Sequence, residues 1–413
     1  MIKLLKPHLL RIPKMRPVLE VEGGTADQRL ILLQEGAAEA ELPEEVRDML
    51  RSGDAERVEH TVQTGYEHLN LAQVLRHMLP AGVEAPSAFE VVGHVAHLNL
   101  REEHEPYKHA IAQAVLDKNH GLRTVVNKTS TIATEFRTFP MEVLAGDDNL
   151  DVEVSECGCR FRFNFREVYW NSRLSREHER VVHSLRPGSV LCDLMCGVGP
   201  FAVPAAKRGC KVFANDLNPN SYKALCANLK LNKVESQVTA SCEDARSFAR
   251  RLAEEGVRYD VAVMNLPASA LEFLDVFRDW DAFTPSPLVH CYCFAPTEGT
   301  VDDIQRRVFS AMGCYLPADA IIRDVRDVSP KKHMYCVTFR VPLASEAARE
   351  APPALLKVVP PEGLPGLPQP IKRPRKVRRE RLQGRAADEE ESKADGTAVR
   401  VAEEGEGEEG AEE

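Results

Sequence analysis

The sequence lacks the features that define several common classes of protein. It has no apolar run long enough to cross a bilayer, so a helical membrane protein is excluded and no membrane partner is expected. It has no internal repeat and no paired CxxC motifs among its 11 cysteines, which predicts reduced thiols in an intracellular protein and no metal site. With 413 residues, 43% of them hydrophobic, the chain is long enough for two or three domains with their own cores.

The excess of acidic over basic residues lies at the end of the chain. Residues 386–413 contain twelve Asp and Glu against Lys393 and Arg400, which alone accounts for the formal net charge of −10. The overall charge therefore does not exclude a nucleic-acid partner. A basic run at residues 372–379 precedes the acidic stretch, and a nuclear address, an RNA tether and a solvated tail are all compatible with it.

The first nineteen residues contain no acid and five basic residues, Lys3, Lys6, Arg11, Lys14 and Arg16. This charge is typical of a mitochondrial presequence, and Met15 offers a second start, whereas a basic N-terminal strand or arm is an equal alternative. We expect the protein in the cytoplasm, with a pool in the mitochondrial matrix and a further pool in the nucleus.

Composition and periodicity divide the chain into four segments. Residues 1–85 form an N-terminal module, residues 86–168 an α+β domain, and residues 169–343 an α/β domain. Residues 344–413 are rich in proline and then in charge, so they are expected to form a disordered tail, because such a segment cannot bury enough apolar surface to fold alone.

The α+β domain is predicted to contain a strand at residues 89–95, a helix at 106–117 and two alternating strands within 150–169. In the last of these strands arginines alternate with aromatic residues, which places Arg160, Arg162 and the nearby Arg166 on one face. A solvated face of a half-buried sheet and a surface for phosphates both fit this pattern.

The third segment alternates short β-rich runs with amphipathic helices, which predicts a parallel sheet covered by helices. The expected strands are residues 189–194, 211–215, 238–242, 260–265 and 289–294. Two final strands, at 320–328 and 334–341, are separated by a turn too short for a parallel crossover, so the last strand enters antiparallel. A mostly parallel Rossmann-like sheet with one late antiparallel strand is typical of class I S-adenosylmethionine-dependent methyltransferases.

Glycines and acids follow these strands at the edge where open α/β sheets bind ligands. Gly197 and Gly199 make a turn that fits a dinucleotide fingerprint as well as an adenosyl site, so the turn alone is weak evidence. Polar residues close four successive strands, and their convergence favours ligand binding although N-capping of helices explains two of them individually. These residues are Asp193, Asn215 with Asp216, Glu243 with Asp244, and Asn265.

Asn265-Leu266-Pro267 resembles the catalytic motif of methyltransferases that act on nitrogens of bases or amides. The amide can donate and accept hydrogen bonds at once, which suits the edge of a nucleobase, while the proline stiffens the loop. Ordinary turns also contain Asn-x-Pro, so the motif is moderately specific.

The chain from about residue 89 to residue 341 resembles the eukaryotic and archaeal tRNA (guanine-37-N1)-methyltransferases. The residues that carry the resemblance are 125–128, 135–137, 141–146, 168–178, 197–201, 215–219 and 265–267. The resemblance implies methylation of N1 of guanosine 37 of tRNA, 3′ of the anticodon, which supports the reading frame and, on tRNA-Phe, starts wybutosine synthesis. It also implies S-adenosyl-L-methionine as the cofactor and a monomer that contacts the anticodon stem-loop and the tRNA body.

The resemblance further implies roles for individual residues. Guanine N1 carries a proton at neutral pH, so its methylation needs a base and a group that stabilises charge on O6. Glu177 is implied as the general base and Arg137 as the cationic partner, with Asn265 and Tyr169 shaping the base pocket. The implied cofactor contacts are His178, Asp193, Gly197, Gly199, Asp216, Leu217, Asp244, Ala245 and Asn265.

Three alternatives stay open at this point. A related enzyme that transfers the aminocarboxypropyl group of the same cofactor would share the fold and the RNA. A non-catalytic RNA-binding protein with this fold is opposed by the intact glycine turn and strand-end acids. A nicotinamide dehydrogenase is the weakest, because its sheet does not need the closing hairpin.

Overall fold

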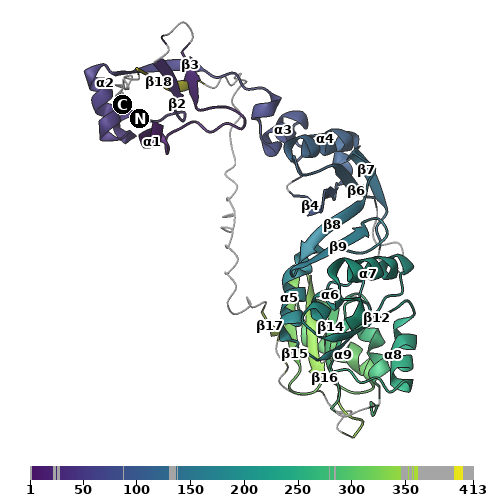
Figure 1. Ribbon diagram of the computed structural model, residues 1–413. Helices are drawn as coiled ribbons and strands as arrows, with labels where there is room; N and C mark the ends of the chain where they lie inside the picture. The colour runs from purple at the N-terminus through teal and green to yellow at the C-terminus, as the bar shows by residue number, and fades with distance from the viewer. Residues whose placement is uncertain are drawn as a thin grey trace, which may run out of the picture. The chain divides into compact units, whose positions relative to one another are not determined.

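The computed structural model describes residues 2–21, 25, 28–86, 88–129, 136, 138–278, 280–282, 285–345, 352, 356, 358–360 and 395–402. The chain divides into two compact units, one made of Met1–Ser87 with Arg375–Glu413 and the other of Ala88–Pro374 (Figure 1). Among the described residues, no helix has the length and apolar character needed to span a membrane.

The first unit is a small antiparallel sheet with short helices. Its sheet has the order β1-β2-β18-β3, and its core contains Leu5, Leu9, Ile31 and Val46. Its elements are α1 (Ile2–Leu5), β1 (Val18–Glu20), β2 (Gln28–Leu32), α2 (Glu44–Ser52), β3 (Ala55–Thr61), α3 (Leu71–Met78) and β18 (Asp395–Ala402).

Strand β18 lies within the segment that the sequence predicted to be a disordered tail, so the structure departs from that prediction here. The strand pairs antiparallel with both β2 and β3 and fills the position between them. Residues 396–402 are small or β-branched apart from one arginine, which suits a strand between two edges that would otherwise lack partners. Residues 358–360 also lie in that predicted tail, where β17 (Val358–Val359) pairs with the second unit's large sheet.

The second unit begins with a four-stranded sheet of order β4-β5-β6-β7, in which α4 (Lys108–Lys118) connects the parallel strands β5 and β6. The single strand predicted at residues 89–95 is instead a hairpin that turns at Gly93, whose φ of 57° is unusual for residues with a side chain. The strands are β4 (Glu90–Val92), β5 (Val95–Leu98), β6 (Thr124–Lys128) and β7 (Met141–Gly146).

The two alternating strands predicted next form a separate hairpin, β8 (Asp151–Glu156) and β9 (Cys159–Asn164), which turns at Cys157-Gly158. Along β9 the residues at 159, 161 and 163 are buried while Arg160 and Arg162 are exposed, as the alternation predicted. The hairpin lies against α7 (Pro219–Asn232) of the following segment (Figure 1).

The large sheet has the predicted class I methyltransferase architecture, with the order β12-β11-β10-β13-β14-β16-β15-β17. The first five strands in this order are parallel, and β16 lies antiparallel between β14 and β15. The strands are β10 (Val190–Asp193), β11 (Lys211–Asn215), β12 (Val238–Ser241), β13 (Val261–Met264), β14 (Leu288–Pro296), β15 (Ile321–Ser329) and β16 (Lys332–Arg340).

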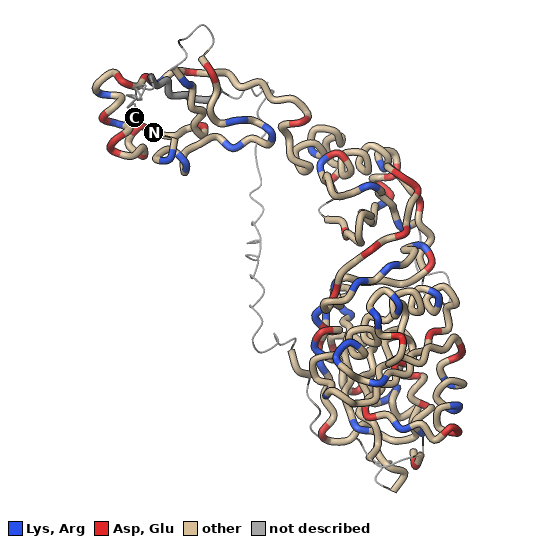
Figure 2. The backbone as a smooth tube through the Cα atoms, in the orientation of Figure 1, with Lys and Arg blue, Asp and Glu red and all other residues tan. Residues whose placement is uncertain are grey.

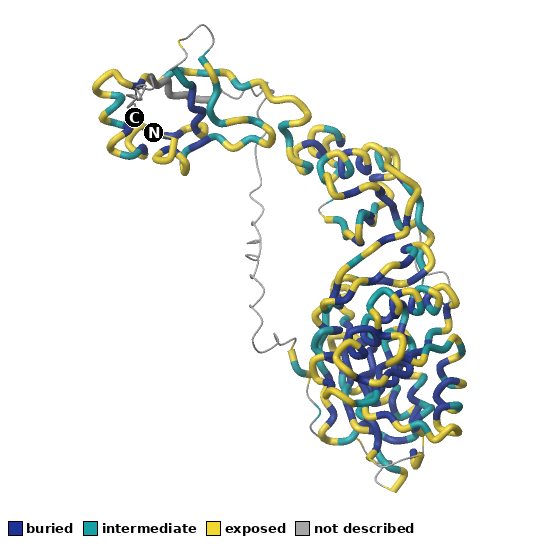
Figure 3. The backbone as a smooth tube through the Cα atoms, in the orientation of Figure 1, coloured by how far each residue is buried: buried dark blue, intermediate teal, exposed yellow. Residues whose placement is uncertain are grey.

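Helices cover both faces of this sheet because its strands are apolar on both sides. One core cluster joins the sheet to α5 (Ser175–Ser184), α6 (Ala202–Lys207), α7 and the β8–β9 hairpin. The other joins it to α8 (Ala245–Glu254), α9 (Thr300–Met312) and the 3₁₀ helix Ala270–Phe277. In Figure 3 the strands between these helices are largely dark blue, which marks buried residues. The candidate site lies at the ends of these strands.

Candidate active site

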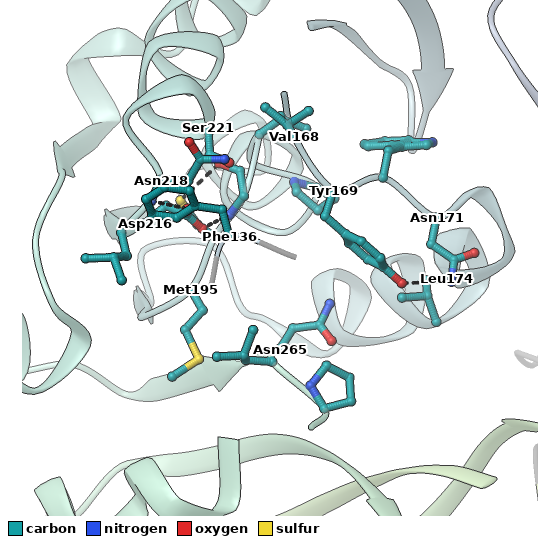
Figure 4. Close-up of a pocket in the computed structure, with 18 of the residues that line it drawn as sticks. Phe136, Val168, Tyr169, Asn171, Leu174, Met195, Asp216, Asn218, Ser221 and Asn265 are labelled. Atoms are coloured by element: carbon teal, nitrogen blue, oxygen red, sulfur yellow. Dashed lines mark hydrogen bonds between the residues drawn. The ribbon is translucent and has the colours of Figure 1, made fainter. Parts of the chain in front are cut away.

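A cavity of about 480 Å³ opens at the carboxyl ends of the parallel strands. Its walls come from the strand-end loops of the large sheet and from the segment that includes β6 and residues 168–171. In Figure 4, Asp216, Asn218 and Ser221 lie on one side of the cavity, Tyr169 and Asn171 on the other, and Met195 and Asn265 below them. The predicted edge of the sheet is therefore hollow, and residues from distant parts of the sequence meet there.

The glycine turn after β10 has the backbone that its sequence predicted. Gly197 and Gly199 have φ of 56° and 96°, which L side chains rarely adopt. A Cβ atom at Gly199 would lie 2.7 Å from a methyl group of Leu225 and 2.9 Å from one of Val203, so only glycine fits between these helices. Gly197 lines the cavity, where its missing side chain lets a ligand approach the backbone.

Asp216, at the end of β11, presents a fixed carboxylate to the cavity. Its Oδ2 accepts from the Gly197 backbone N–H at 2.8 Å and its Oδ1 accepts from that of Asn218 at 2.9 Å. Burial raises the pKa of Asp216 above its usual value, although these two hydrogen bonds and a third from the Ser221 side chain oppose that shift. A carboxylate has about four acceptor sites, so it retains capacity for about one further donor, such as a ribose hydroxyl.

Asp193, at the end of β10, is fully buried, and neither of its carboxylate oxygens has a well-formed hydrogen bond. Burial, and then the charge of Asp216, raise its pKa well above the usual value. It does not line the cavity, but it lies two residues before Met195, which does. An unsatisfied buried carboxylate beside a cavity favours a ligand that carries donors or positive charge.

Asp244 and Ala245 line the cavity at the start of α8. The Asp244 carboxylate caps this helix by accepting from the backbone N–H groups of Arg246 and Ser247 at 3.0 and 3.2 Å. Asn215, which is fully buried, donates to the carbonyl oxygens of Leu194 and Glu243 and so ties neighbouring strand ends together. For Asp244, capping and ligand binding are thus compatible, since the cap fixes the side chain at the cavity edge.

Asn265 and Tyr169 both line the cavity, and in Figure 4 Asn265 lies below Tyr169. The Oδ1 atom of Asn265 is buried and has no hydrogen-bond partner within the described residues. The Tyr169 hydroxyl accepts from the Asn171 side-chain amide at 3.3 Å, while the ring remains 41% exposed. These two side chains can contact the edge and the face of a flat ligand, respectively.

Glu177 does not line the cavity in this structure. It is buried on α5, where its carboxylate accepts from Arg180 Nε at 2.9 Å, Arg180 Nη2 at 2.5 Å and the Tyr292 hydroxyl at 2.9 Å. Burial raises the pKa of Glu177, but the hydrogen bonds and charge of Arg180 and the Tyr292 hydroxyl outweigh it, so the net pKa lies below the usual value. In this arrangement the carboxylate is a weak base.

Several cavity residues carry polar groups that the sequence did not single out. His97 Nε2 and Trp170 Nε1 are buried without a hydrogen-bond partner among the described residues, and burial together with Lys128 lowers the pKa of His97 to about 4. The Lys128 ammonium lies 3.9 Å from the centre of the Phe139 ring, and burial lowers its pKa despite the opposing charge of Glu90. These residues form the wall of the cavity that faces the upstream sheet.

Comparisons with known proteins agree with this geometry. Residues 152–313 match the TRM5/TYW2 methyltransferase domain family, and residues 71–149 match the TYW2 N-terminal domain family. A tRNA (guanine(37)-N(1))-methyltransferase from Phytophthora infestans is 46% identical over 85% of this chain and 89% of its own, and one from Dictyostelium discoideum is 41% identical over 82% and 76%. The chain belongs to the tRNA (guanine(37)-N(1))-methyltransferase family. The crystal structure of Trm5b from Pyrococcus abyssi is 28% identical with a TM-score of 0.53, over 68% of this chain and 82% of that one.

In this family member the structure brings most of the predicted site residues to one cavity. The ones that line it are Tyr169, His178, Gly197, Asp216, Leu217, Asp244, Ala245 and Asn265. Gly199 supports the turn behind the wall, whereas Asp193 and Glu177 are buried next to it. Arg137 lies outside the described residues. Lys128 and Trp170 lie within the sequence motifs at residues 125–128 and 168–178, which were the available signal for them, whereas His97 lies in no motif.

Proposed function

We propose that this methyltransferase transfers the methyl group of S-adenosyl-L-methionine to N1 of guanosine 37 of tRNA. The observation that carries the proposal is the shared cavity, in which the Asp216 carboxylate and the glycine turn face Asn265 and Tyr169. A cofactor and a nucleobase can thus meet in one enclosed space. Relatives with 46% and 41% identity are named for this reaction, which fixes the acceptor that the cavity alone does not specify.

The residues at the strand ends fit the cofactor. Asp216 retains acceptor capacity for a ribose hydroxyl. Asp244 caps α8 at the cavity edge, where its carboxylate can also accept from an adenine amino group. Asp193 has no well-formed hydrogen bond of its own, which suits a cofactor that carries an ammonium and a sulfonium group. When bound, S-adenosyl-L-methionine supplies an electrophilic methyl group on sulfur.

The chemistry at guanine requires the protein to take a proton from N1 and to stabilise negative charge on O6. We assign Asn265 to the edge of the base, because its Oδ1 is unpartnered and its amide can both accept from N–H and donate to oxygen. Tyr169 contributes an exposed ring against which the base can stack. Arg137 is the proposed cation for O6.

We infer that Glu177 accepts the N1 proton only after its contacts change. Both carboxylate oxygens now bind Arg180, and one also binds the Tyr292 hydroxyl. Release from Arg180 removes the largest of the interactions that lower the pKa of Glu177, so that burial, which raises it, is opposed mainly by the Tyr292 hydroxyl. The same exchange therefore makes the carboxylate a better base and frees it for guanine.

The proposed RNA surface extends from the cavity to Lys128 and the exposed side of the β8–β9 hairpin. Arg160 and Arg162 both pair with Glu153, at 3.5 and 2.5 Å, and Arg166 pairs with Asp148 at 3.1 Å. Figure 2 shows acidic positions on β8 and basic positions on β9 of this hairpin. Because Arg160, Arg162 and Arg166 are already paired with carboxylates, they must exchange partners to bind phosphates.

The test is methylation of tRNA transcripts that differ only at position 37. With guanosine 37 we expect a product that gains one methyl group, located at N1 by mass spectrometry of the nucleosides, and no product with adenosine 37. A larger adduct on guanosine 37 would instead support transfer of the aminocarboxypropyl group, and cofactor binding without turnover on any transcript would support a non-catalytic RNA-binding protein.

The location of the protein and its monomeric state are also proposals. Leu5 and Leu9 are 0% and 8% exposed in the core of the first unit, so residues 1–14 contribute to its fold in addition to any role in targeting. We propose cytoplasmic, mitochondrial and nuclear pools. Imaging of the products that start at Met1 and at Met15 tests this, and identical distributions would argue against targeting by the first fourteen residues.

A further inference from the structure

Beside the cavity, a buried glutamate from the β8–β9 hairpin contacts a histidine of α5. The Oε1 atom of Glu156 lies 2.5 Å from Nδ1 of His178. The two side chains are only 6% and 4% exposed, so water does not screen the interaction. Glu156 ends β8, which precedes the methyltransferase sheet in the sequence, whereas His178 lies on the wall of the cavity.

The contact leaves the other nitrogen of the imidazole ring available. An ionised carboxylate only accepts hydrogen bonds, so the hydrogen of this pair lies on Nδ1. His178 Nε2 has no partner within the described residues. The ring also packs edge-on against Phe201, with centroids 4.6 Å apart at 76°, so both its position and its rotation are fixed.

The hairpin that carries Glu156 is itself attached to the glycine turn. Asn228, fully buried on α7, accepts from the backbone N–H of Arg162 at 2.7 Å and donates to the carbonyl of Val198 at 3.1 Å. Val198 lies between the two glycines of the turn and lines the cavity. Asn232 makes a similar pair of bonds with the backbone of Arg160, at 3.0 and 2.7 Å. The hairpin thus cannot shift without moving the turn.

We propose that Glu156 is a positioning residue for the cofactor. It holds His178 in the orientation and protonation state in which Nε2 faces S-adenosyl-L-methionine, in the way that carboxylates orient histidine ligands of metals. The β8–β9 hairpin is therefore part of the cofactor site as well as a neighbour of the RNA. This inference rests on the proposed function, because it names the same cofactor.

The test measures binding of S-adenosyl-L-methionine by titration calorimetry on the full chain without RNA. We expect Glu156→Ala to weaken binding about tenfold, at the low end of the effect of removing such an outer partner from a metal-binding histidine. Glu156→Gln should stay within about threefold of the unsubstituted protein, because its amide oxygen still accepts from Nδ1–H. Glu153→Gln is the matched control on the same strand and should bind normally, since Glu153 is 39% exposed and contacts only arginines.

A double-mutant cycle separates positioning from general stability. If Glu156 acts through His178, Glu156→Ala adds no further loss of affinity in a His178→Asn background. In ¹⁵N-histidine spectra of the unsubstituted protein, we expect the His178 proton on Nδ1, and Glu156→Ala should remove this preference.

Equal affinity of Glu156→Ala and the unsubstituted protein would overturn the proposal. So would additive losses in the cycle, or Glu156→Gln binding as weakly as Glu156→Ala with an equally lowered melting temperature. Failure of the unsubstituted protein to bind S-adenosyl-L-methionine is a different result, because it would overturn the proposed function itself.

Discussion

The cavity has a strand-end wall, formed by the loops after the parallel strands, and an upstream wall, formed by β5, β6 and residues 168–171. The two walls differ in how many of their polar side-chain groups have hydrogen-bond partners within the protein. On the strand-end wall, Asp216 and Asp244 already accept backbone hydrogen bonds, and Asn215 spans two strand ends. On the upstream wall, His97 Nε2 and Trp170 Nε1 have no partner among the described residues, and Lys128 makes only a contact with an aromatic ring.

This difference indicates how each wall binds its ligand. A group that is already oriented binds a small cofactor without ordering itself first, so affinity is gained at low entropic cost. A buried polar group without a partner has given up its hydrogen bonds to water, and this cost in free energy remains until a ligand supplies a new partner. We therefore expect the strand-end wall to bind the cofactor before RNA arrives and the upstream wall to be completed by the RNA. Asp193, Asn265 Oδ1 and His178 Nε2 are exceptions on the cofactor side, because they too lack partners among the described residues, and we expect bound ligands to supply these partners.

Substitution of Glu177 is expected to have the largest effect. Both of its carboxylate oxygens already accept hydrogen bonds, although its proposed role as a base requires a free carboxylate. We expect Glu177→Gln to slow single-turnover methylation by about 10²–10⁴-fold, the usual contribution of a positioned base. Cofactor and tRNA affinities should stay near normal. The stability should fall by about 1–3 kcal/mol, because Arg180 loses its charged partner.

Glu179→Gln, on the same helix, is the control for the loss of a carboxylate. A methylation rate within threefold of normal for Glu177→Gln, together with lowered stability, would restrict Glu177 to a structural role.

The pH dependence of stability supplies a second check. Because the pKa of Glu177 is lowered in the folded state, its contribution is complete above the usual pKa of 4.5 and is lost as the pH falls through the folded value. The difference in melting temperature between the two proteins should therefore narrow below about pH 4.5.

The contrast between the walls also explains which parts of the site the sequence could predict. The strand-end residues follow a local rule, since a polar residue that closes a parallel strand must lie at one edge of the sheet. Asp216, Asp244 and Asn265 were found in this way, and the antiparallel direction of the last strand followed from the length of the turn before it.

The upstream wall has a weaker signal. Lys128 and Trp170 lie in motifs, but His97, on β5, lies in none, and only the packing of separate segments brings these residues to the cavity. The environment of Glu177 was also out of reach, because Tyr292 comes from a strand 115 residues later. The same holds for Glu156. A strand in its region could be predicted from the sequence, whereas its contact with His178 on α5 could not.

Asp216→Asn tests the strand-end wall alone. The amide cannot accept on both sides, so it loses one of the bonds from the Gly197 and Asn218 backbone N–H groups and turns a donor toward one of them. Hydrogen bonds to charged groups contribute about 1.5–3 kcal/mol, so we expect the dissociation constant for S-adenosyl-L-methionine to rise about 10–100-fold. The KM for tRNA should not change.

Titration calorimetry and steady-state kinetics measure these two quantities separately. Glu235→Gln removes an exposed carboxylate from the same sheet region and should leave both unchanged. If Asp216→Asn raised the KM for tRNA as much as the cofactor dissociation constant, the two walls would not be independent, and the comparison would fail.

Lys128→Met is the reciprocal test and has the smallest expected effect. It keeps most of the length of the side chain and the contact with Phe139 but removes a half-buried cation that forms no ion pair with the residues the structure describes. We expect the KM for tRNA to rise about tenfold and the salt dependence of RNA binding to fall by about one unit of slope, as for the loss of one phosphate contact. Cofactor affinity should stay normal, because no strand-end residue depends on Lys128.

Lys230→Met, at an exposed position of α7, is the matched control for charge. An unchanged salt slope with a raised KM would assign Lys128 to a base or to packing instead of a phosphate, and an effect on cofactor binding would show that the upstream wall also belongs to the cofactor site.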